Sequence, residues 1–318
     1  MNSFMTTSMN TYIGSKGYNI LKDELNESQL ILLKSKLIAK PKIKSSIGNG
    51  TVIKFPIYRE SPKKIYMPRY FGEEYFGPPK KNNLSDGIPI NVPFIGTLRD
   101  HQIPAVQSYL NYCLERKDNA CGLLELDCAA GKTVLSLYIL SQLKVKTLII
   151  LNKEFLMNQW MERIREFLPS AKIGKIQGKI IDIEEKDIVL GMINSLSMKE
   201  YKNDTFYSFG LTILDEVHHI SSEVFSNSLF KIVTKYMLGL SATLESKDGK
   251  SNVIKMFLGE VVYKGINNQQ HDVDVRVIEY ISENEEFNKI ETDRRGNPQY
   301  SKMIVKLCKY QRRSDFII

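Results

Sequence analysis

From about Phe94 onward, short apolar runs alternate regularly with amphipathic segments. Five of these runs are expected to be strands, near residues 122–126, 146–151, 188–193, 211–215 and 236–241. Short runs that are apolar throughout, separated by helical patterns, are typical of parallel strands buried on both faces. The alternation therefore predicts an α/β fold in which helices cover both faces of a parallel sheet.

One intervening segment, EFLMNQWMERIREFL, has apolar residues at helical spacing. A helix there would pack one face on the sheet. Trp160 is the only tryptophan of the chain, and core packing is its default interpretation. The residues expected on the packed face are Phe155, Leu156, Trp160, Ile164 and Leu168.

The sequence before Phe94 has a different character. Residues 26–37 are expected to form a short amphipathic helix. The turn signal Gly48-Asn49-Gly50 and the run TVIKFPIY after it are typical of a hairpin. Residues 78–92 have the composition of a linker, and a last helix is expected over MIVKLCKYQRRSDF. We therefore expect a small α+β N-terminal domain (1–92), the α/β domain (93–271) and a connecting segment (272–318).

The composition is that of a soluble folded protein, with 42% hydrophobic and 25% charged residues. No run approaches the ~20 apolar residues of a membrane span, and the N-terminus lacks the pattern of a signal peptide. An intracellular protein is expected. The four cysteines have neither CxxC spacing nor a histidine at zinc-ligand spacing, which predicts free thiols at Cys113, Cys121, Cys128 and Cys308.

The net charge of +8 is unevenly distributed. Residues 1–95 hold 14 Lys and Arg against 7 Asp and Glu, so most of the excess lies in the N-terminal domain. A polyanionic partner such as nucleic acid would explain this asymmetry. A solvated basic surface that only confers solubility explains it equally well.

The most informative motif is LLELDCAAGKTVLSLYIL, an apolar strand followed by a short loop, GKT and a helix. Backbone N–H groups of such a loop can surround a phosphate, Lys132 can reach the β- and γ-phosphate oxygens, and the Thr133 hydroxyl can bind Mg²⁺. Leu126 and Ala129 stand where such loops commonly have glycine, and GKT also occurs by accident. The expected ATP-binding residues here are Cys128, Ala129, Ala130, Gly131, Lys132, Thr133 and Val134.

A second motif, LTILDEVHH, brings two acidic residues to the end of an apolar strand. Carboxyl ends of strands are where α/β sheets bind ligands. Asp215 would bind Mg²⁺, and Glu216 would orient and deprotonate the attacking water. Taken alone, Asp215 and Glu216 could be solvated acids of a loop, and the two histidines could form a metal site. The GKT motif upstream makes a nucleotide site a better explanation than either alternative.

These motifs are followed by Ser241-Ala242-Thr243, and the ordered set resembles motifs I, II and III of superfamily 2 helicases. The resemblance implies a RecA-like fold, ATP and Mg²⁺ as cofactors, and coupling of hydrolysis to movement through His218, Ser241 and Thr243. LRDHQ, at residues 98–102, is similar to the adenine-recognition element of that superfamily. It implies that Gln102 bonds the adenine edge and that Arg99 stacks on the ring; an ordinary helix start is the alternative.

Other segments narrow the resemblance. Four segments resemble sequences of the branch that contains XPB, UvsW and the poxvirus transcript-release helicase. They are LGLSATLESKDGK, FLGEVVYKG, NQW and IQGK. The segment from YIGSKGYNI to MPRYFG resembles the front end of helicases from large cytoplasmic DNA viruses. A viral protein would act in the host cytoplasm or the virion, and a role in transcription is one expectation.

The resemblance implies that loops at the sheet edge bind the backbone of one nucleic-acid strand, independently of base sequence. It also implies that the nucleic acid is DNA rather than RNA. Small polar groups suit such contacts, although each could instead have a turn or capping role. The candidates are Asn152, Lys153, Asn194 and Ser195. Basic residues of the N-terminal domain could extend the nucleic-acid-binding surface. They are Lys63, Lys64, Arg69, Lys80 and Lys81.

The family's motors hold ATP between two RecA-like domains, and arginines of the second domain complete the site. No corresponding motif follows Thr243, so the resemblance implies a second RecA-like domain supplied in cis or in trans. The chain alone is then expected to hydrolyse ATP slowly. Two other hypotheses stay open: a catalytically incomplete nucleic-acid-binding or assembly module, and a duplex translocase that does not separate strands.

Overall fold

The computed structural model describes residues 9–39, 54–117, 119–127, 129–219, 222–243, 250–265, 278–293 and 296–317. It divides into two compact units, Met1–Asn267 and Asn268–Ile318, which are described separately. No helix in these described ranges has the length and apolarity that a membrane crossing requires.

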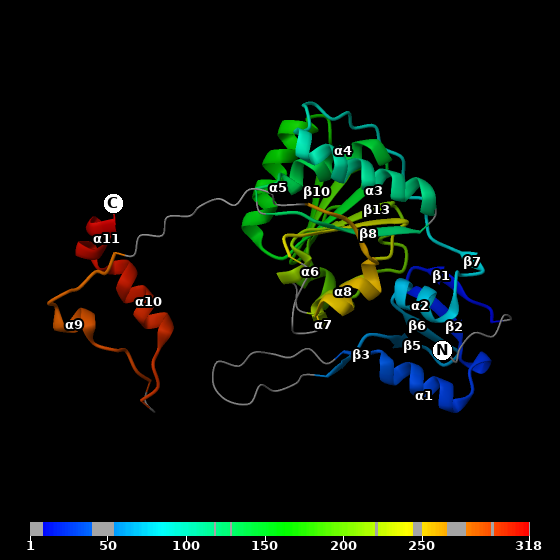
Figure 1. Cartoon of the computed structure of the whole chain (residues 1–318), viewed down its shortest axis with the longest axis horizontal. Helices are drawn as coiled ribbons and strands as arrows, with labels where there is room; N and C mark the ends of the chain where they lie inside the picture. Colours follow the sequence, from blue (N-terminus) through cyan, green and yellow to red (C-terminus); the bar gives the residue numbers. More distant parts are fainter. Residues whose placement is uncertain are drawn as a thin grey trace. The chain divides into compact units, whose positions relative to one another are not determined.

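The first unit is built on an eight-stranded sheet in the order β11-β10-β12-β9-β13-β14-β8-β15 (Figure 1). Neighbouring strands run parallel except β10 and β11, which are antiparallel. The parallel α/β fold and all five expected strands are confirmed, whereas β10, β11 and β15 were not predicted. The strands are β8 (Ala120–Glu125), β9 (Thr147–Leu151), β10 (Ile173–Gln177), β11 (Ile180–Ile181), β12 (Ile188–Met192), β13 (Leu211–Leu214), β14 (Tyr236–Ser241) and β15 (Val261–Lys264).

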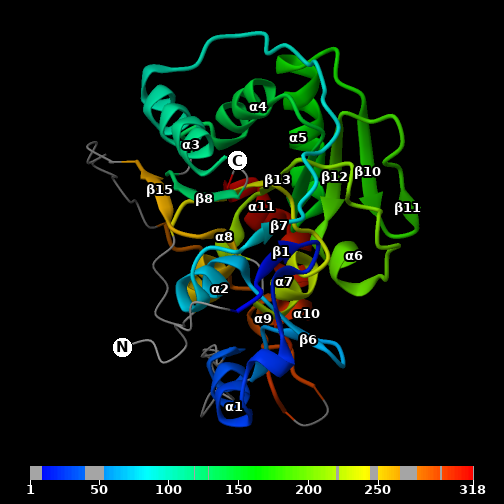
Figure 2. The ribbon, with the colours of Figure 1, turned by 90° about the vertical axis from the view of Figure 1, so that its right-hand side faces the viewer.

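Helices cover both faces of this sheet (Figures 1 and 2). One face carries α3 (Ile103–Arg116), α4 (Lys132–Leu143) and α5 (Glu154–Phe167), and the other α6 (Ile193–Met198), α7 (Ser222–Leu229) and α8 (Lys250–Leu258). Side chains of β9 alternate between two cores: Ile149 and Leu151 join one, Leu148 and Ile150 the other. Because both faces are buried at the centre of the sheet, strands β9, β12 and β13 consist mainly of apolar residues.

Helix α5 confirms the predicted packed face except at one position. Trp160, Ile164 and Leu168 are buried, but Phe155 is 55% exposed and Met157 is buried in its place. Phe155 precedes Trp160 by five positions, which at 3.6 residues per turn turns it more than one-third of a turn from the buried stripe. The prediction for Phe155 was wrong because its hydrophobicity was given more weight than its angular position.

The N-terminal segment forms a second, five-stranded sheet in the order β5-β6-β2-β1-β7. The helix expected over residues 26–37 is confirmed, and the Asn26 side chain accepts a hydrogen bond from the Gln29 N–H at its start. The turn at Gly48-Asn49-Gly50 lies outside the described residues. The elements are β1 (Tyr12–Gly14), β2 (Gly17–Leu21), α1 (Glu27–Lys36), β3 (Ile38–Ala39), β4 (Phe55–Pro56), β5 (Arg59–Glu60), β6 (Lys64–Met67), α2 (Arg69–Phe76) and β7 (Lys81–Asn82).

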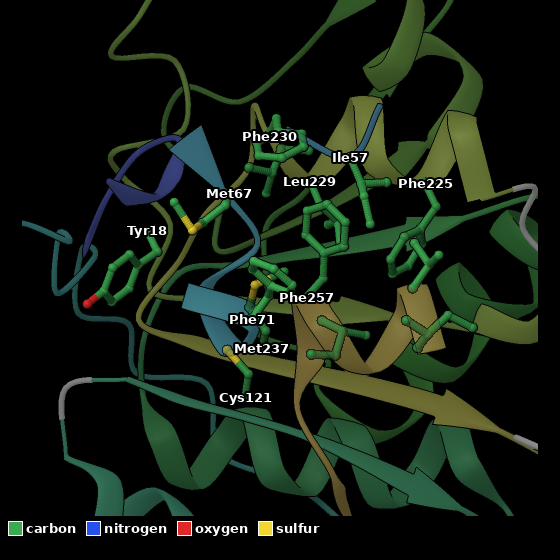
Figure 3. Close-up of a cluster of buried hydrophobic side chains, with 14 of the residues drawn as sticks. Tyr18, Ile57, Met67, Phe71, Cys121, Phe225, Leu229, Phe230, Met237 and Phe257 are labelled. Carbon is green, nitrogen blue, oxygen red and sulfur yellow. The ribbon is translucent and has the colours of Figure 1, made fainter. Parts of the chain in front are cut away.

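This N-terminal segment and the large sheet share one hydrophobic core (Figure 3). Tyr18 and Phe71 pack in the same cluster as Met237 of β14 and Phe257 of α8. Figure 2 shows α2 and β1 on the side of the sheet that carries α7 and α8. The N-terminal segment therefore packs directly on the α/β domain, on the face opposite α3, α4 and α5.

Arg69 is part of this packing rather than of an exposed basic surface. Its side chain is 2% exposed and donates hydrogen bonds to Asn119 Oδ1 at 2.5 Å and to the Thr234 carbonyl oxygen at 2.7 Å. The sequence-based suggestion that Arg69 extends a nucleic-acid path is wrong, because its guanidinium group is enclosed by protein acceptors.

The second unit contains α9 (Glu285–Asn288), α10 (Tyr300–Lys309) and α11 (Gln311–Ile317). The single last helix expected from the sequence is two helices, separated at Tyr310. Tyr310 stacks on Phe287 with ring centroids 4.3 Å apart, and Tyr280 packs edge-on against both rings. This aromatic cluster joins α9 to the residue between α10 and α11, and its three side chains are partly exposed.

Candidate active site at the carboxyl ends of the strands

Parallel strands deliver the loops that follow them to one edge of the sheet. The loop after β8 leads to Lys132, and Asp215 and Glu216 follow β13. Strand β14 lies between β8 and β13 and ends at Ser241. The three predicted motifs are therefore brought together although they are distant in sequence.

The loop between β8 and α4, where phosphate binding is predicted, contains a single glycine, Gly131. Gly131 has φ +76° and Ala129 has φ +67°, a left-handed conformation that usually favours glycine. Leu126 is 4% exposed and its N–H donates to the Ser241 carbonyl oxygen at 2.8 Å. Leu126 thus fills the core at the strand end, where glycine would leave a hole. Cys128 lies outside the described residues.

Lys132 and Glu216 form an ion pair across the end of β14. Lys132 Nζ lies 3.3 Å from Glu216 Oε1, and it also donates to the Leu126 carbonyl oxygen at 3.3 Å. Glu216 has φ +50°, a strained conformation for a residue with a side chain. Its buried Oε2 atom has no hydrogen-bond partner among the described residues, although His218 Nδ1 is 3.4 Å away.

Asp215 is held by a side chain of α5, the helix that follows the neighbouring strand β9. Only 6% of it is exposed, and Trp160 Nε1 donates a hydrogen bond to Asp215 Oδ2 at 2.8 Å. Burial raises the pKa of Asp215 above the ordinary carboxyl value, while the bond from Trp160 opposes that rise. The interpretation of Trp160 as a core residue is correct but incomplete, since its ring N–H contacts the predicted metal ligand.

His218, Ser241 and Thr243 are connected in series. His218 Nδ1 lies 2.9 Å from Ser241 Oγ, and the Ser241 hydroxyl donates to the Thr243 carbonyl oxygen at 2.8 Å. Because the single hydroxyl proton is directed at Thr243, this geometry favours an Nδ1–H tautomer of His218 that donates to Ser241. The predicted coupling residues are therefore in direct contact.

Gln102 contacts the phosphate-binding loop. Its Nε2 donates to the carbonyl oxygens of Ala130 (3.1 Å) and Gly131 (3.3 Å), and its Oε1 accepts from the Arg99 N–H at 2.9 Å. The Arg99 side chain is exposed, and His101 Nε2 lies 3.3 Å from the Ala130 carbonyl oxygen. The LRDHQ segment therefore contacts the carbonyl oxygens of the loop through Gln102 and His101. The contact of His101 was not predicted from the sequence.

The candidates for nucleic-acid contact lie at the same edge, after β9 and β12. Lys153 and Asn194 are exposed, whereas Asn152 Oδ1 is buried without a partner in the described structure. Ser195 Oγ accepts a hydrogen bond from the N–H of Gly178 at 3.0 Å. This side chain therefore holds the turn between β10 and β11. Lys153 Nζ lies 5.7 Å from the centre of the Phe155 ring.

The residues at this edge suit a magnesium ion. Mg²⁺ prefers oxygen ligands and keeps several waters when proteins bind it. The Thr133 hydroxyl at the start of α4 and the Asp215 carboxylate could supply oxygens, and Glu216 Oε2 is a buried acceptor without a partner in the described residues. This donor set fits Mg²⁺ better than a softer metal.

Comparison with known proteins agrees with this architecture. The family model described as the res subunit of type III restriction enzymes matches residues 95–246. A protein of Acanthamoeba polyphaga mimivirus, named as an ATP-dependent RNA helicase, is 31% identical over 321 residues that cover 99% of this chain. The chain spans 61% of the length of that relative.

Two further matches are a DNA translocase and the solved structure of a phage helicase. The DNA 3'-5' translocase XPB2 of Sulfurisphaera tokodaii is 34% identical over 187 residues, which are 58% of this chain and 39% of the translocase. The UvsW helicase of bacteriophage T4 has the same fold, with a TM-score of 0.53 at 17% identity over 81% of this chain and all of that chain. Residues 95–246 therefore match a helicase domain, and the chain is similar to a helicase that a large DNA virus encodes.

Proposed function

We propose that this chain is the first motor half of an ATP-dependent nucleic-acid helicase or translocase. The observation that carries the proposal is the meeting of Lys132, Asp215 and Glu216 at the carboxyl edge of one parallel sheet. A cation, a metal-binding carboxylate and a second carboxylate at such an edge are what ATP hydrolysis requires. Residues 95–246 match a helicase family, which supports the same reaction.

In this mechanism Lys132 would bind the β- and γ-phosphates, and Thr133 and Asp215 would hold Mg²⁺, which when bound would neutralise phosphate charge. Glu216 orients the attacking water through one carboxylate oxygen and accepts its proton. The loop residues Ala129, Ala130, Gly131 and Val134 would contribute backbone N–H groups and shape to the phosphate pocket.

The base-binding role follows from the position of Gln102 beside that loop. Its amide already bonds to Ala130 and Gly131, so adenine recognition would need one of its polar groups to turn toward the base. Arg99 is exposed and free to stack on a flat ring. A nucleotide base there would thus be sensed by the same side chain that supports the phosphate loop.

Nucleic acid would cross the loops after β9 and β12. Lys153 supplies a positive charge, Asn152 and Asn194 supply amides, and Ser195 contributes mainly by shaping its loop. Such contacts address the backbone and not the bases. We propose DNA as the preferred track, as in the XPB2 translocase by its name, although the mimivirus relative is named for RNA.

A complete motor would need a second RecA-like domain to close on the nucleotide. The relative from mimivirus is longer than this chain, which leaves room for that domain in the whole protein. Transition-state charge on the γ-phosphate would be stabilised from both sides only after closure. The chain alone should therefore bind ATP but turn it over slowly.

The direct test is the ATPase rate of the chain with and without single- and double-stranded DNA and RNA, with Glu216→Gln as the inactive control. Stimulation by one polymer that is lost in Glu216→Gln would establish a motor and identify its track. Magnesium-dependent ATP binding with negligible turnover would assign the missing catalytic groups to a second domain. A chain that binds nucleic acid but no nucleotide would overturn the proposal in favour of a binding or assembly module.

A further inference from the structure

Trp160 contacts the proposed metal ligand from a helix that carries none of the three motifs. It lies in the middle of α5, 55 residues before Asp215, and its Nε1 is 2.8 Å from Asp215 Oδ2. Trp160 is 1% exposed and Asp215 is 6% exposed. Water therefore cannot replace either partner of this hydrogen bond.

The fold makes the contact rigid. Helix α5 follows β9 after a two-residue link, and β9 pairs directly with β13, the strand that ends before Asp215. Met157 and Ile164 are buried on the same face of α5 as Trp160, so packing fixes the indole orientation. An indole N–H can only donate and does not titrate, so the direction of the bond is fixed too.

The chemistry of the donor suits a carboxylate that has to bind a cation. A lysine or arginine in that place would neutralise the carboxylate and compete with the metal. A neutral donor stabilises the carboxylate and sets its rotamer while leaving the full negative charge for the metal. Trp160 occupies one lone pair of Asp215 Oδ2, which leaves Oδ1 and the remaining lone pairs of the carboxylate for a metal ion.

We propose that Trp160 is a positioning residue for the metal-binding carboxylate of Asp215, acting through its ring N–H in addition to filling the core. This role rests on the proposed function, because it assigns a task to Asp215 in metal binding. It differs from a packing role in what it requires: packing needs the ring volume, whereas positioning needs the N–H.

The chain allows these two requirements to be separated. Trp160 is the only tryptophan, so replacing tryptophan by an analogue whose indole is changed to benzothiophene alters one position. The analogue keeps the bicyclic shape and has sulfur in place of the N–H. Trp160→Phe is the genetically encoded counterpart, and Met157→Leu is the matched control, since it changes a buried side chain of the same helix and keeps the N–H of Trp160.

The measurement is the affinity of the full chain for Mn²⁺, a paramagnetic substitute for Mg²⁺, in the presence of a non-hydrolysable ATP analogue. Free Mn²⁺ is followed by electron paramagnetic resonance, so no turnover is needed. Loss of a hydrogen bond to a metal ligand commonly weakens metal binding by about 10-fold to 100-fold. We expect at least the lower value for the benzothiophene analogue and for Trp160→Phe, and the wild-type affinity for Met157→Leu.

Wild-type Mn²⁺ affinity in the benzothiophene protein would overturn the positioning role and leave the proposed function intact. An equal loss in Met157→Leu would also overturn it, because packing would then explain the effect. Absence of nucleotide-dependent Mn²⁺ binding in the unmodified chain would instead overturn the proposed function, and with it the task assigned to Trp160. If Trp160→Phe unfolds, the benzothiophene protein alone decides the question.

Discussion

Lys132 Nζ lies 3.3 Å from Glu216 Oε1, so the cation after β8 and the carboxylate after β13 meet across the end of β14. Both side chains are largely shielded from water, with 10% and 23% exposure. A phosphate bound by Lys132 has to compete with Glu216 for the same ammonium group. Nucleotide binding would then release Glu216 to act on water.

Glu216→Gln should separate binding from hydrolysis. Glutamine keeps the size of the side chain but cannot accept a proton, and general-base catalysis contributes about 10²- to 10⁴-fold. ATP turnover should fall by a factor in that range, while nucleotide affinity should stay equal or rise because Lys132 loses its paired charge. Steady-state hydrolysis and titration with a fluorescent ATP analogue measure the two effects.

Glu154→Gln is a suitable control, because Glu154 begins α5 and its exposed side chain accepts a hydrogen bond from the Gln177 side chain. It should leave turnover unchanged. Loss of nucleotide affinity in Glu216→Gln would contradict the competition between Glu216 and phosphate.

Asp215→Asn should stabilise the fold while it abolishes magnesium-dependent hydrolysis. Burial raises the pKa of Asp215 in the folded state, so the ionised carboxylate costs stability at neutral pH. This cost grows as pH rises from the unfolded value of about 3.9 through the raised folded value. The melting temperature of Asp215→Asn should therefore exceed that of the wild type at pH 7, by about 2–4 °C per kcal/mol for a domain of this size.

The difference between the two proteins should shrink as pH falls and should vanish well below about 3.9, where Asp215 is protonated in both the folded and the unfolded state. Thermal unfolding in metal-free buffer across this range is the measurement. A lower melting temperature for Asp215→Asn at pH 7 would show that Trp160 and Lys132 more than offset the burial of the charge.

The motif positions could be predicted because each motif ends an apolar strand, and parallel strands share one carboxyl edge. GKT and DEVH are local patterns of this kind. The bond between Trp160 and Asp215 could not be predicted, because it depends on β9 pairing with β13 and on the angle at which α5 crosses them. The burial of Arg69 likewise depends on how the N-terminal sheet docks, and no local pattern encodes that docking.

Ser241→Ala should weaken the link between hydrolysis and nucleic acid. The Ser241 hydroxyl joins His218 to the backbone of Thr243, and its removal leaves the histidine without that acceptor. A single hydrogen bond is worth about 1 kcal/mol, so nucleic-acid stimulation of hydrolysis should fall by up to about 10-fold while the unstimulated rate changes little. ATPase rates over a titration of single-stranded DNA measure this.

Ser226→Ala is the control, since Ser226 is equally buried but its hydroxyl donates to the Glu223 carbonyl oxygen within α7. An equal loss of stimulated and unstimulated rates in Ser241→Ala would place Ser241 in the hydrolytic step itself and not in coupling.

Arg69→Met should loosen the N-terminal sheet from the helicase domain. Methionine preserves much of the apolar stem, but the Asn119 side chain and the Thr234 carbonyl oxygen lose a charged donor in a site that water does not reach. Unsatisfied buried acceptors cost about 1–3 kcal/mol each, so the free energy of unfolding should fall by roughly 2–4 kcal/mol. Equilibrium unfolding in urea, followed by circular dichroism, measures the change.

Lys64→Met is the matched control, because Lys64 bonds Tyr12 on the outer part of the same N-terminal sheet and does not contact the helicase domain through that bond. It should shift the urea midpoint by much less. Because both parts share one core, the wild type should unfold in a single transition, and Arg69→Met should either lower that midpoint or split it in two. Identical midpoints for Arg69→Met and Lys64→Met would mean that apolar packing around Phe71 and Met237 holds the N-terminal sheet in place without the arginine.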